Sequence, residues 1–154
     1  KKFYITVFII SLLSLLIALY IEFFLGYKPC KLCIYQRIPY LITIFLTFLG
    51  ISYSKNLIWL YALLLIFFSS FILSGYHVGI ERGIFEEFSG CTGSSLNIID
   101  KNELLKLLNS EVSSCKNVEF QILGLSLATI NFLLSFVIFI LIFKVIKYEK
   151  NKQI

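Results

Sequence analysis

The sequence predicts an all-α membrane protein in which four transmembrane helices form one bundle. Of its 154 residues, 58% are hydrophobic and only 15% are charged, which lies well outside the range of soluble globular proteins. Four apolar stretches are each long enough to cross a bilayer, which needs about 20 helical residues. We place them near residues 3–25, 34–53, 57–79 and 122–145. We therefore expect residues 1–154 to form a single integral membrane domain, with the first stretch retained rather than cleaved as a signal peptide.

The basic residues predict which side of the membrane holds the termini. Seven of the fourteen lie in the termini and in the short turn between the second and third stretches. They are Lys1, Lys2, Lys55, Lys144, Lys147, Lys150 and Lys152. The positive-inside rule places such segments in the cytoplasm. All four cysteines fall on the other side, where disulfides persist, so we expect extracytoplasmic loops at residues 26–33 and 80–121. The net charge of +5 then reflects membrane topology, and we expect no nucleic-acid partner.

The second stretch opens on two cysteines in the run Pro29-Cys30-Lys31-Leu32-Cys33. Cysteines spaced three apart share one face of a helix, and proline suits the first helical turn. The amino end of a helix stabilises a thiolate through its dipole and free N–H groups. We interpret the two cysteines as a redox pair. A structural disulfide or half of a zinc site is the alternative, but zinc needs further ligands and the chain has no second C-x-x-C or histidine pair. We expect no metal.

Two further polar residues are candidates for the same site. Arg37 lies one helical turn after Cys33 inside an apolar run, where it either anchors the helix at the interface or stabilises a thiolate and a reduced, anionic acceptor. His77, the single histidine, should lie near the outer end of the third stretch, either as an interfacial polar group or as a proton shuttle for an acceptor.

Three charged residues near these positions are given simpler interpretations. Glu22 could pair with Arg37 or Lys28, but an interfacial carboxylate is the simpler assignment. We expect Glu81 and Arg82 to be solvated.

The long loop carries the second pair of cysteines. Cys91 and Cys115 enclose the 23 residues 92–114, and a disulfide closing such a loop would stabilise the fold by somewhat more than about 3 kcal/mol. The flanking residues are small and polar, which would leave the sulfurs accessible for exchange. This pair alone supports a structural disulfide and a redox-active, exchanging disulfide equally. The neighbouring C-x-x-C favours the redox-active one. Between the two cysteines, residues 100–108 predict a short amphipathic helix, which could lie on the membrane interface or equally pack on the ends of the spans.

Taken together, these residues resemble the DsbB family of quinone-reducing membrane enzymes of disulfide bond formation. The nine residues from Pro29 to Arg37 (Pro-Cys-Lys-Leu-Cys-Ile-Tyr-Gln-Arg) match the redox motif of that family almost residue for residue. Residues 76–81 and 123–128 are similar to family segments at the outer end of the third span and at the start of the fourth. The chain departs from the family after Cys115, where Lys116-Asn117-Val118-Glu119-Phe120 replaces an acidic residue and a later Pro-Trp pair.

The resemblance implies a four-helix bundle, a bound quinone (ubiquinone or menaquinone) and a periplasmic thioredoxin-fold partner of the DsbA type. Cys91 would form the mixed disulfide with the partner, and Cys115 would exchange with Cys30. Cys33 would pass electrons to the quinone, with Arg37 and His77 beside it. The protein would be a monomer in the bacterial inner membrane, with cytoplasmic termini and periplasmic cysteines.

Two functions of different classes follow. The first is a thiol:quinone oxidoreductase that reoxidises the DsbA-type partner and so supports disulfide bond formation in exported proteins. The second is a disulfide-stapled membrane receptor or assembly protein without redox turnover. A protein like vitamin K epoxide reductase is a weaker enzyme alternative, because its loop cysteines precede the C-x-x-C in the chain.

Overall fold

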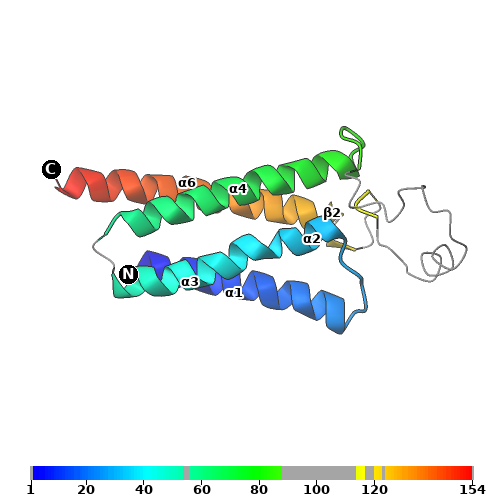
Figure 1. Ribbon diagram of the computed structural model, residues 1–154, viewed down its shortest axis with the longest axis horizontal. Helices are drawn as coiled ribbons and strands as arrows, with labels where there is room; N and C mark the ends of the chain where they lie inside the picture. The colour runs from blue at the N-terminus through cyan, green and yellow to red at the C-terminus, as the bar shows by residue number, and fades with distance from the viewer. Residues whose placement is uncertain (1, 54–55, 88–113, 117–119, 123, 154) are drawn as a thin grey trace, which may run out of the picture.

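Four long helices lie side by side along one axis of the molecule (Figure 1). The computed structural model describes residues 2–53, 56–87, 114–116, 120–122 and 124–153. Within these, the long helices are α1 (Lys2–Phe23), α3 (Arg37–Ser52), α4 (Ile58–Glu81) and α6 (Leu127–Gln153). A short helix, α2 (Lys31–Tyr35), leads into α3, and the two together make one span. All four spans are long and apolar enough to cross a membrane, which confirms the predicted all-α membrane bundle.

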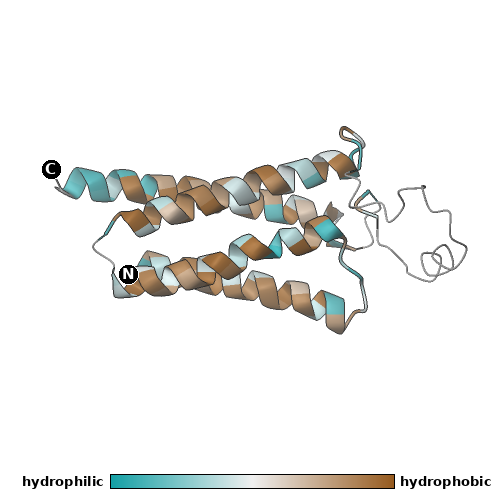
Figure 2. Ribbon diagram, viewed as in Figure 1, coloured by the Kyte–Doolittle hydropathy of each residue, from teal (hydrophilic) through white to brown (hydrophobic). Residues whose placement is uncertain are grey.

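The bundle is apolar on its outer surface, as Figure 2 shows along the long helices. Large side chains such as Phe45, Phe48 and Leu65 are about two-thirds or more exposed, at 73%, 67% and 66%. This pattern suits a lipid environment, because lipid tails are as apolar as the side chains they meet. Small hydroxyl residues are instead fully buried between the helices. They are Ser11, Thr43, Thr47, Ser70, Ser74 and Ser135.

The helices pack chiefly as two pairs, α1 against α3 and α4 against α6, with α3 and α4 joining the pairs. The hydrophobic core includes Tyr4, Leu63, Phe67 and Ile142, which are at most 4% exposed. Gly50 of α3 allows the close approach of α1, because a Cβ at this position would lie only 2.5 Å from the Tyr4 ring. Small residues at such crossings let transmembrane helices pack closely.

The fourth span begins later than the sequence predicts. The predicted start at Ile122 falls instead in a small antiparallel hairpin of β1 (Gln121–Ile122) and β2 (Leu125–Ser126). Gly124 turns the chain there in the left-handed region, with φ of 79°. Ser126 then caps α6, since its hydroxyl oxygen accepts a hydrogen bond from the Thr129 backbone N–H at 3.1 Å. The helix runs on to Gln153, beyond the predicted end at Val145.

The second and third spans also differ from prediction at their outer ends. The second span begins at Lys31 rather than Ile34, and α4 ends at Glu81 rather than Gly79. Both differences add polar residues to the helices at the end that holds the cysteine pair. Cys91 and the predicted interfacial helix over residues 100–108 lie outside the described residues.

The contact between Gly50 and Tyr4 gives a test of the packing. Gly50→Ala should lower the free energy of unfolding of the purified protein in detergent by about 1–3 kcal/mol, because the added methyl group must displace a buried ring. The unfolding midpoint on heating should fall accordingly. Gly75→Ala is the matched control, since its Cβ would lie 3.1 Å from the edge of Phe132 and needs only a small adjustment. Equal unfolding midpoints for Gly50→Ala and the wild type would contradict this account of the α1–α3 contact.

Candidate redox site

Cys30 and Cys33 face each other at the amino end of α2. Cys30 is the N-cap residue, with extended backbone (φ −68°, ψ 166°), and its sulfur accepts a hydrogen bond from the Cys33 backbone N–H at 3.3 Å. The two Sγ atoms lie 3.0 Å apart, and both cysteines are free thiols. Pro29 precedes the cap, as the sequence predicts for a helix start. The pair is thus held at the helix end where backbone N–H groups stabilise negative charge.

The short helix that carries the pair ends because of Pro39. Proline has no N–H to donate to the carbonyl of Tyr35, and its ring crowds that carbonyl. The chain therefore turns at Gln36 between α2 and α3, as expected for a proline at this position. The turn lies next to the cysteines and directs the Gln36 side chain into the bundle, where it is only 7% exposed.

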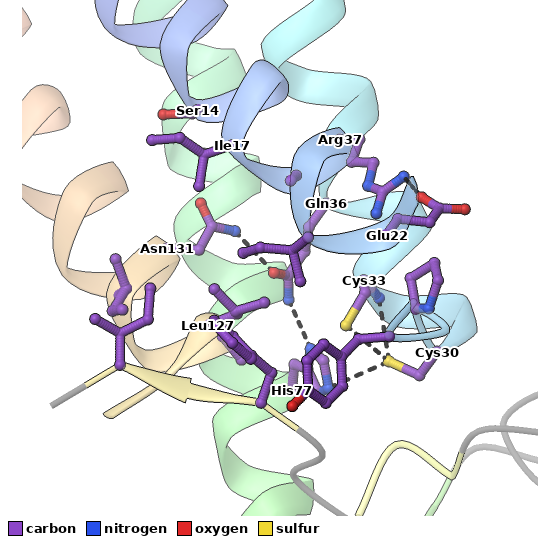
Figure 3. Close-up of a pocket in the computed structure, with 18 of the residues that line it drawn as sticks. Ser14, Ile17, Glu22, Cys30, Cys33, Gln36, Arg37, His77, Leu127 and Asn131 are labelled. Carbon is purple, nitrogen blue, oxygen red and sulfur yellow. Dashed lines mark hydrogen bonds and ion pairs between the residues drawn. The ribbon is translucent and has the colours of Figure 1, made fainter. Parts of the chain in front are cut away.

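His77 of α4 lies against the cysteine pair from the opposite side (Figure 3). It is 2% exposed, and its Nε2 is 3.6 Å from Cys30 Sγ. The other ring nitrogen, Nδ1, is 2.9 Å from Gln36 Nε2. The structure therefore brings the single histidine into the site, as one of its two sequence interpretations required.

Gln36 and Asn131 are site residues that the sequence interpretation missed. Asn131 of α6 donates from Nδ2 to Gln36 Oε1 at 2.8 Å, and its own Oδ1 accepts from the Tyr40 hydroxyl. Both amides lie in spans predicted to be apolar. A polar residue in a membrane span is by default a functional candidate, and that signal could have identified them.

Glu81 was expected to be solvated, and this expectation is wrong. Its side chain is only 11% exposed, with Oε1 3.8 Å from His77 Nε2. The other carboxylate oxygen accepts a hydrogen bond from the Ser126 hydroxyl at 2.5 Å. Burial occurs because α4 continues to Glu81, and the hairpin before α6 brings Ser126 over its end. The expected exposure of Arg82 is confirmed.

Arg37 forms an ion pair with Glu22 of α1, visible in Figure 3. Both side chains are partly buried, at 20% and 28% exposure. The pairing that the sequence analysis set aside is therefore the observed one. A carboxylate that binds one edge of a guanidinium orients the group and leaves its other N–H donors available.

These groups share one cavity of about 290 Å³. Side chains of α1, α2, α3, α4 and α6 line it, together with Ser114, Cys115, Phe120 and Ile122 from the segment before α6. The predicted site residues that line it are Cys30, Cys33, Arg37, His77 and Cys115. Apolar residues such as Ile17 of α1 and Leu134 of α6 form much of the wall. An apolar pocket with a few convergent polar groups is the usual form of a small-molecule site.

Cys115 joins the first pair of cysteines at the outer end of this cavity. It is 2% exposed and belongs to a buried cluster with Cys30, Leu32 and Ile80. It is disulfide-bonded, whereas Cys30 and Cys33 are not. A buried position beside Cys30 places one sulfur of the loop next to the C-x-x-C.

The surroundings of Cys30 stabilise its thiolate. The hydrogen bond from the Cys33 thiol lowers the pKa of Cys30 most, and the neighbouring His77 lowers it further. Burial of the sulfur opposes both effects without cancelling them, so the pKa of Cys30 lies well below its ordinary value. A low pKa makes a thiol a reactive nucleophile near neutrality and a good leaving group in disulfide exchange.

The donor atoms also define what else the site could hold. The ligand atoms of Cys30, Cys33 and His77 lie within 4.8 Å of one another, a set of types that zinc accepts. For an organic ligand with two carbonyl oxygens, the cavity instead offers hydrogen-bond donors on Arg37, His77 and Asn131 between apolar walls. A quinone headgroup fits this chemistry, since its carbonyls accept hydrogen bonds and its ring is apolar.

Comparison with known proteins agrees with the motif. The family model described as "Disulfide bond formation protein DsbB" matches residues 1–145. An "Uncharacterized protein RP370" of Rickettsia prowazekii (strain Madrid E) is 31% identical over 149 residues, covering 94% of this chain and 86% of the relative. Two proteins named "Disulfide bond formation protein B", from the Temecula1 and 9a5c strains of Xylella fastidiosa, are each 30% identical over 119 residues. Each alignment covers 71% of this chain and 68% of the relative.

The contact between Cys30 and His77 predicts a specific pH dependence. A thiol with a lowered pKa reacts with iodoacetamide down to more acidic pH than a free cysteine does. His77→Ala removes a donor to the thiolate, so the midpoint of Cys30 alkylation should rise by about 1–2 pH units. Peptide mapping by mass spectrometry separates alkylation at Cys30 from that at Cys33. An unchanged midpoint in folded His77→Ala protein would refute a role of the histidine in thiolate stability.

Proposed function

Because the chain belongs to the DsbB family and so has a role in disulfide bond formation, we propose that it is a membrane thiol:quinone oxidoreductase. Its proposed electron donor is a periplasmic dithiol oxidase of the DsbA type, and its proposed acceptor is ubiquinone or menaquinone. The observation that carries the proposal is the shared cavity, in which Cys30, Cys33 and Cys115 meet Arg37 and His77. The cysteines that would exchange disulfides and the hydrogen-bond donors that would hold the quinone therefore line the same cavity.

The proposed exchange moves one disulfide inward in steps. The partner's thiolate attacks Cys91, forms a mixed disulfide and releases Cys115 as a thiolate. Cys115 attacks Cys30 of the oxidised C-x-x-C pair, which forms a Cys30–Cys115 disulfide and releases Cys33. The partner's second thiolate then attacks the mixed disulfide, which releases the oxidised partner and frees Cys91. Cys91 attacks Cys115, re-forms the loop disulfide and leaves Cys30 and Cys33 reduced. When the Cys30–Cys33 disulfide re-forms, it gives up two electrons and two protons, which a bound quinone would accept.

The geometry supports Cys30 as the sulfur that exchanges with Cys115. The two lie in one buried cluster, and Cys30 is the one whose environment stabilises a thiolate. Cys33 lies one helical turn before Arg37, and both line the cavity. A thiolate released at Cys33 would thus share the cavity with the guanidinium of Arg37.

The residues suited to holding the quinone are Arg37, His77 and Asn131, with Ile17 and Leu134 on the apolar walls. A bound quinone supplies an acceptor for two electrons and two protons. The Glu22 carboxylate orients Arg37 through their ion pair, and His77 can hold or move a proton at Nε2, beside Cys30 and Glu81. Of the two sulfurs, that of Cys30 belongs to a buried residue and that of Cys33 to a partly buried one.

The energetics explain why a separate acceptor is needed. A DsbA-type oxidase has a potential near −120 mV, while ordinary structural disulfides lie below about −300 mV and could not reoxidise it. A strong oxidant that dissolves in the membrane can reach the depth of the site and reoxidise the Cys30–Cys33 pair there. We further propose cytoplasmic termini and periplasmic cysteines in a bacterial inner membrane, since the lysine-rich ends and the oxidising chemistry both favour that orientation.

The alternative is a disulfide-stapled receptor or assembly protein. Two free thiols held 3.0 Å apart against a buried histidine are unlike a permanent staple. This arrangement supports the oxidoreductase, and thiol trapping with and without a reduced partner distinguishes the two functions. Cysteines whose thiol or disulfide state is the same in both conditions would indicate a purely structural disulfide.

Serine variants of the cysteines test the electron path. Cys33→Ser should abolish reduction of added quinone, because no disulfide can re-form at the C-x-x-C. Cys91→Ser should abolish oxidation of the partner, while a small dithiol that reaches Cys30–Cys33 directly still supports turnover. Both are measured anaerobically by titrating dithiol against quinone. Full quinone-dependent turnover by Cys33→Ser would exclude the mechanism.

Substitution of the arginine tests where the acceptor binds. Arg37→Gln should raise the KM for quinone about 10- to 100-fold, because a hydrogen bond to a charged group is worth about 1.5–3 kcal/mol. Arg82→Gln is the control, since Arg82 is exposed and lies outside the cavity lining. Equal KM values in the two variants would place the acceptor elsewhere.

A further inference from the structure

We propose that Gln36 and Asn131 are positioning residues that fix the tautomer of His77, so that its Nε2–H points at Cys30. This inference deepens the proposed function, since it concerns how the exchanging sulfur is kept reactive. Within the part of the chain that the structure describes, neither amide is hydrogen-bonded to a sulfur atom. Both therefore act on Cys30 through the histidine.

The two amides form a continuous chain of hydrogen bonds with the histidine, which the dashed lines of Figure 3 trace from Asn131 to Gln36 and on to His77. Asn131 Nδ2 donates to Gln36 Oε1 at 2.8 Å, and Gln36 Nε2 is 2.9 Å from His77 Nδ1. At the far end, Asn131 Oδ1 accepts from the hydroxyls of Tyr40 and Ser135, the latter at 3.4 Å. The amide of Asn131 is therefore anchored by two donors on its oxygen.

The donors in this series of hydrogen bonds all point the same way, from Asn131 through Gln36 toward the ring. Because Asn131 presents its NH₂ group to Gln36, the oxygen of Gln36 must face Asn131 and its NH₂ must face the ring. The NH₂ group has no lone pair to accept with, so His77 Nδ1 is the acceptor. A neutral imidazole with an accepting Nδ1 carries its proton on Nε2.

The proton on Nε2 is directed at the site. Among the described residues, the acceptors near Nε2 are Cys30 Sγ at 3.6 Å and Glu81 Oε1 at 3.8 Å. The same direction of the chain disfavours a metal, because a histidine that binds a metal through Nε2 donates its Nδ1–H to a neighbour. The amides thus favour a hydrogen-bonded thiolate over metal binding at the same three side chains.

Because the hydrogen-bonded side chains are buried, they favour one tautomer of His77 over the other. His77 is 2% exposed and Gln36 7% exposed, so a bond lost within the chain is not replaced by bulk water. Leaving a buried donor or acceptor unsatisfied is costly. The opposite tautomer would set an N–H of the ring against an N–H of Gln36, unless both amides rotated together.

The groups that could affect titration of Cys30 come from each element packed against it. Cys33 lies on α2, His77 and Glu81 lie on α4, and Cys115 is held in a disulfide and does not titrate. The same cavity is lined by the charged residues Glu22, Lys28 and Arg37. Asn131→Leu leaves all of these groups in place and adds no charge, whereas Gln36→Glu leaves them in place and adds one carboxylate beside the ring.

The single histidine allows a direct test by nitrogen NMR. The full chain is labelled with ¹⁵N-histidine, so the ring signals of His77 are the only ones present. In wild-type protein with reduced Cys30–Cys33, at a pH where the ring is neutral, we expect a proton on Nε2 and none on Nδ1. Gln36→Glu should protonate Nδ1, because a carboxylate accepts there, and Asn131→Leu should give a mixture. A wild-type ring protonated on Nδ1, or a ring unaffected by both variants, would overturn the proposal.

Alkylation of Cys30 provides a second readout with a matched control. Asn131→Leu should raise the alkylation midpoint by roughly one pH unit and Gln36→Glu should lower it, since a doubly protonated ring stabilises a thiolate more strongly. Ser74→Ala, a buried hydroxyl on α4 that bonds to its own helix, should change nothing. In a His77→Ala background both effects should vanish.

Effects that persist without the histidine would show a general structural role and overturn the proposal. The readout is thiol titration rather than turnover. A protein that titrates as expected but does not reduce quinone would refute the proposed function alone.

Discussion

A histidine buried in an apolar bundle must find all its hydrogen-bond partners within the protein, and at His77 this constraint organises the site. The side chain is 2% exposed, and water cannot satisfy its ring nitrogens. Its partners come from three other segments: Cys30 at the start of α2, Gln36 at the turn before α3, and Asn131 of α6 through Gln36. One set of polar contacts therefore fixes the relative positions of three spans at the depth of the cysteines.

The interruption of the second span makes those contacts possible. An unbroken helix through residues 31–52 would keep Gln36 and Arg37 in strict register with the cysteines. Pro39 prevents the bond to the Tyr35 carbonyl, and the chain turns at Gln36 instead. Gln36 then reaches the histidine while Arg37 reaches Glu22 of α1. Two adjacent residues thus serve opposite sides of one cavity.

The sequence was sufficient for the four spans and for the cysteine pair, because both depend on local patterns. Apolar length predicts a membrane helix, and the Pro-Cys-x-x-Cys spacing predicts a helix start with sulfurs on one face. It was not sufficient for the partners across the bundle. The spans are apolar on nearly all sides, so periodicity does not reveal which face of each helix points inward. Gln36, Glu81 and Asn131 were missed for that reason, although their polarity within or beside the spans was a usable signal. Residues 122–126 were predicted to open the fourth span because their apolar side chains continue its pattern, whereas the structure has a hairpin there that turns at Gly124.

The asymmetry between the two sulfurs follows from this arrangement and has a chemical consequence. Cys30 has the donors: the Cys33 backbone N–H, the Cys33 thiol and the histidine. It also shares a buried cluster with Cys115. Under the proposed function, exchange with the loop requires a sulfur that both attacks and leaves readily, and a stabilised thiolate suits that requirement. Cys33 lies further along the helix toward Arg37, so the proposed function would divide its two half-reactions between the two sulfurs. If one sulfur did both, its thiolate would have to be stabilised for exchange with the loop disulfide and also for reduction of an acceptor in the membrane. In this arrangement His77 lies beside Cys30, and Arg37 lies one helical turn beyond Cys33. Each sulfur would then need to suit only one of the two reactions.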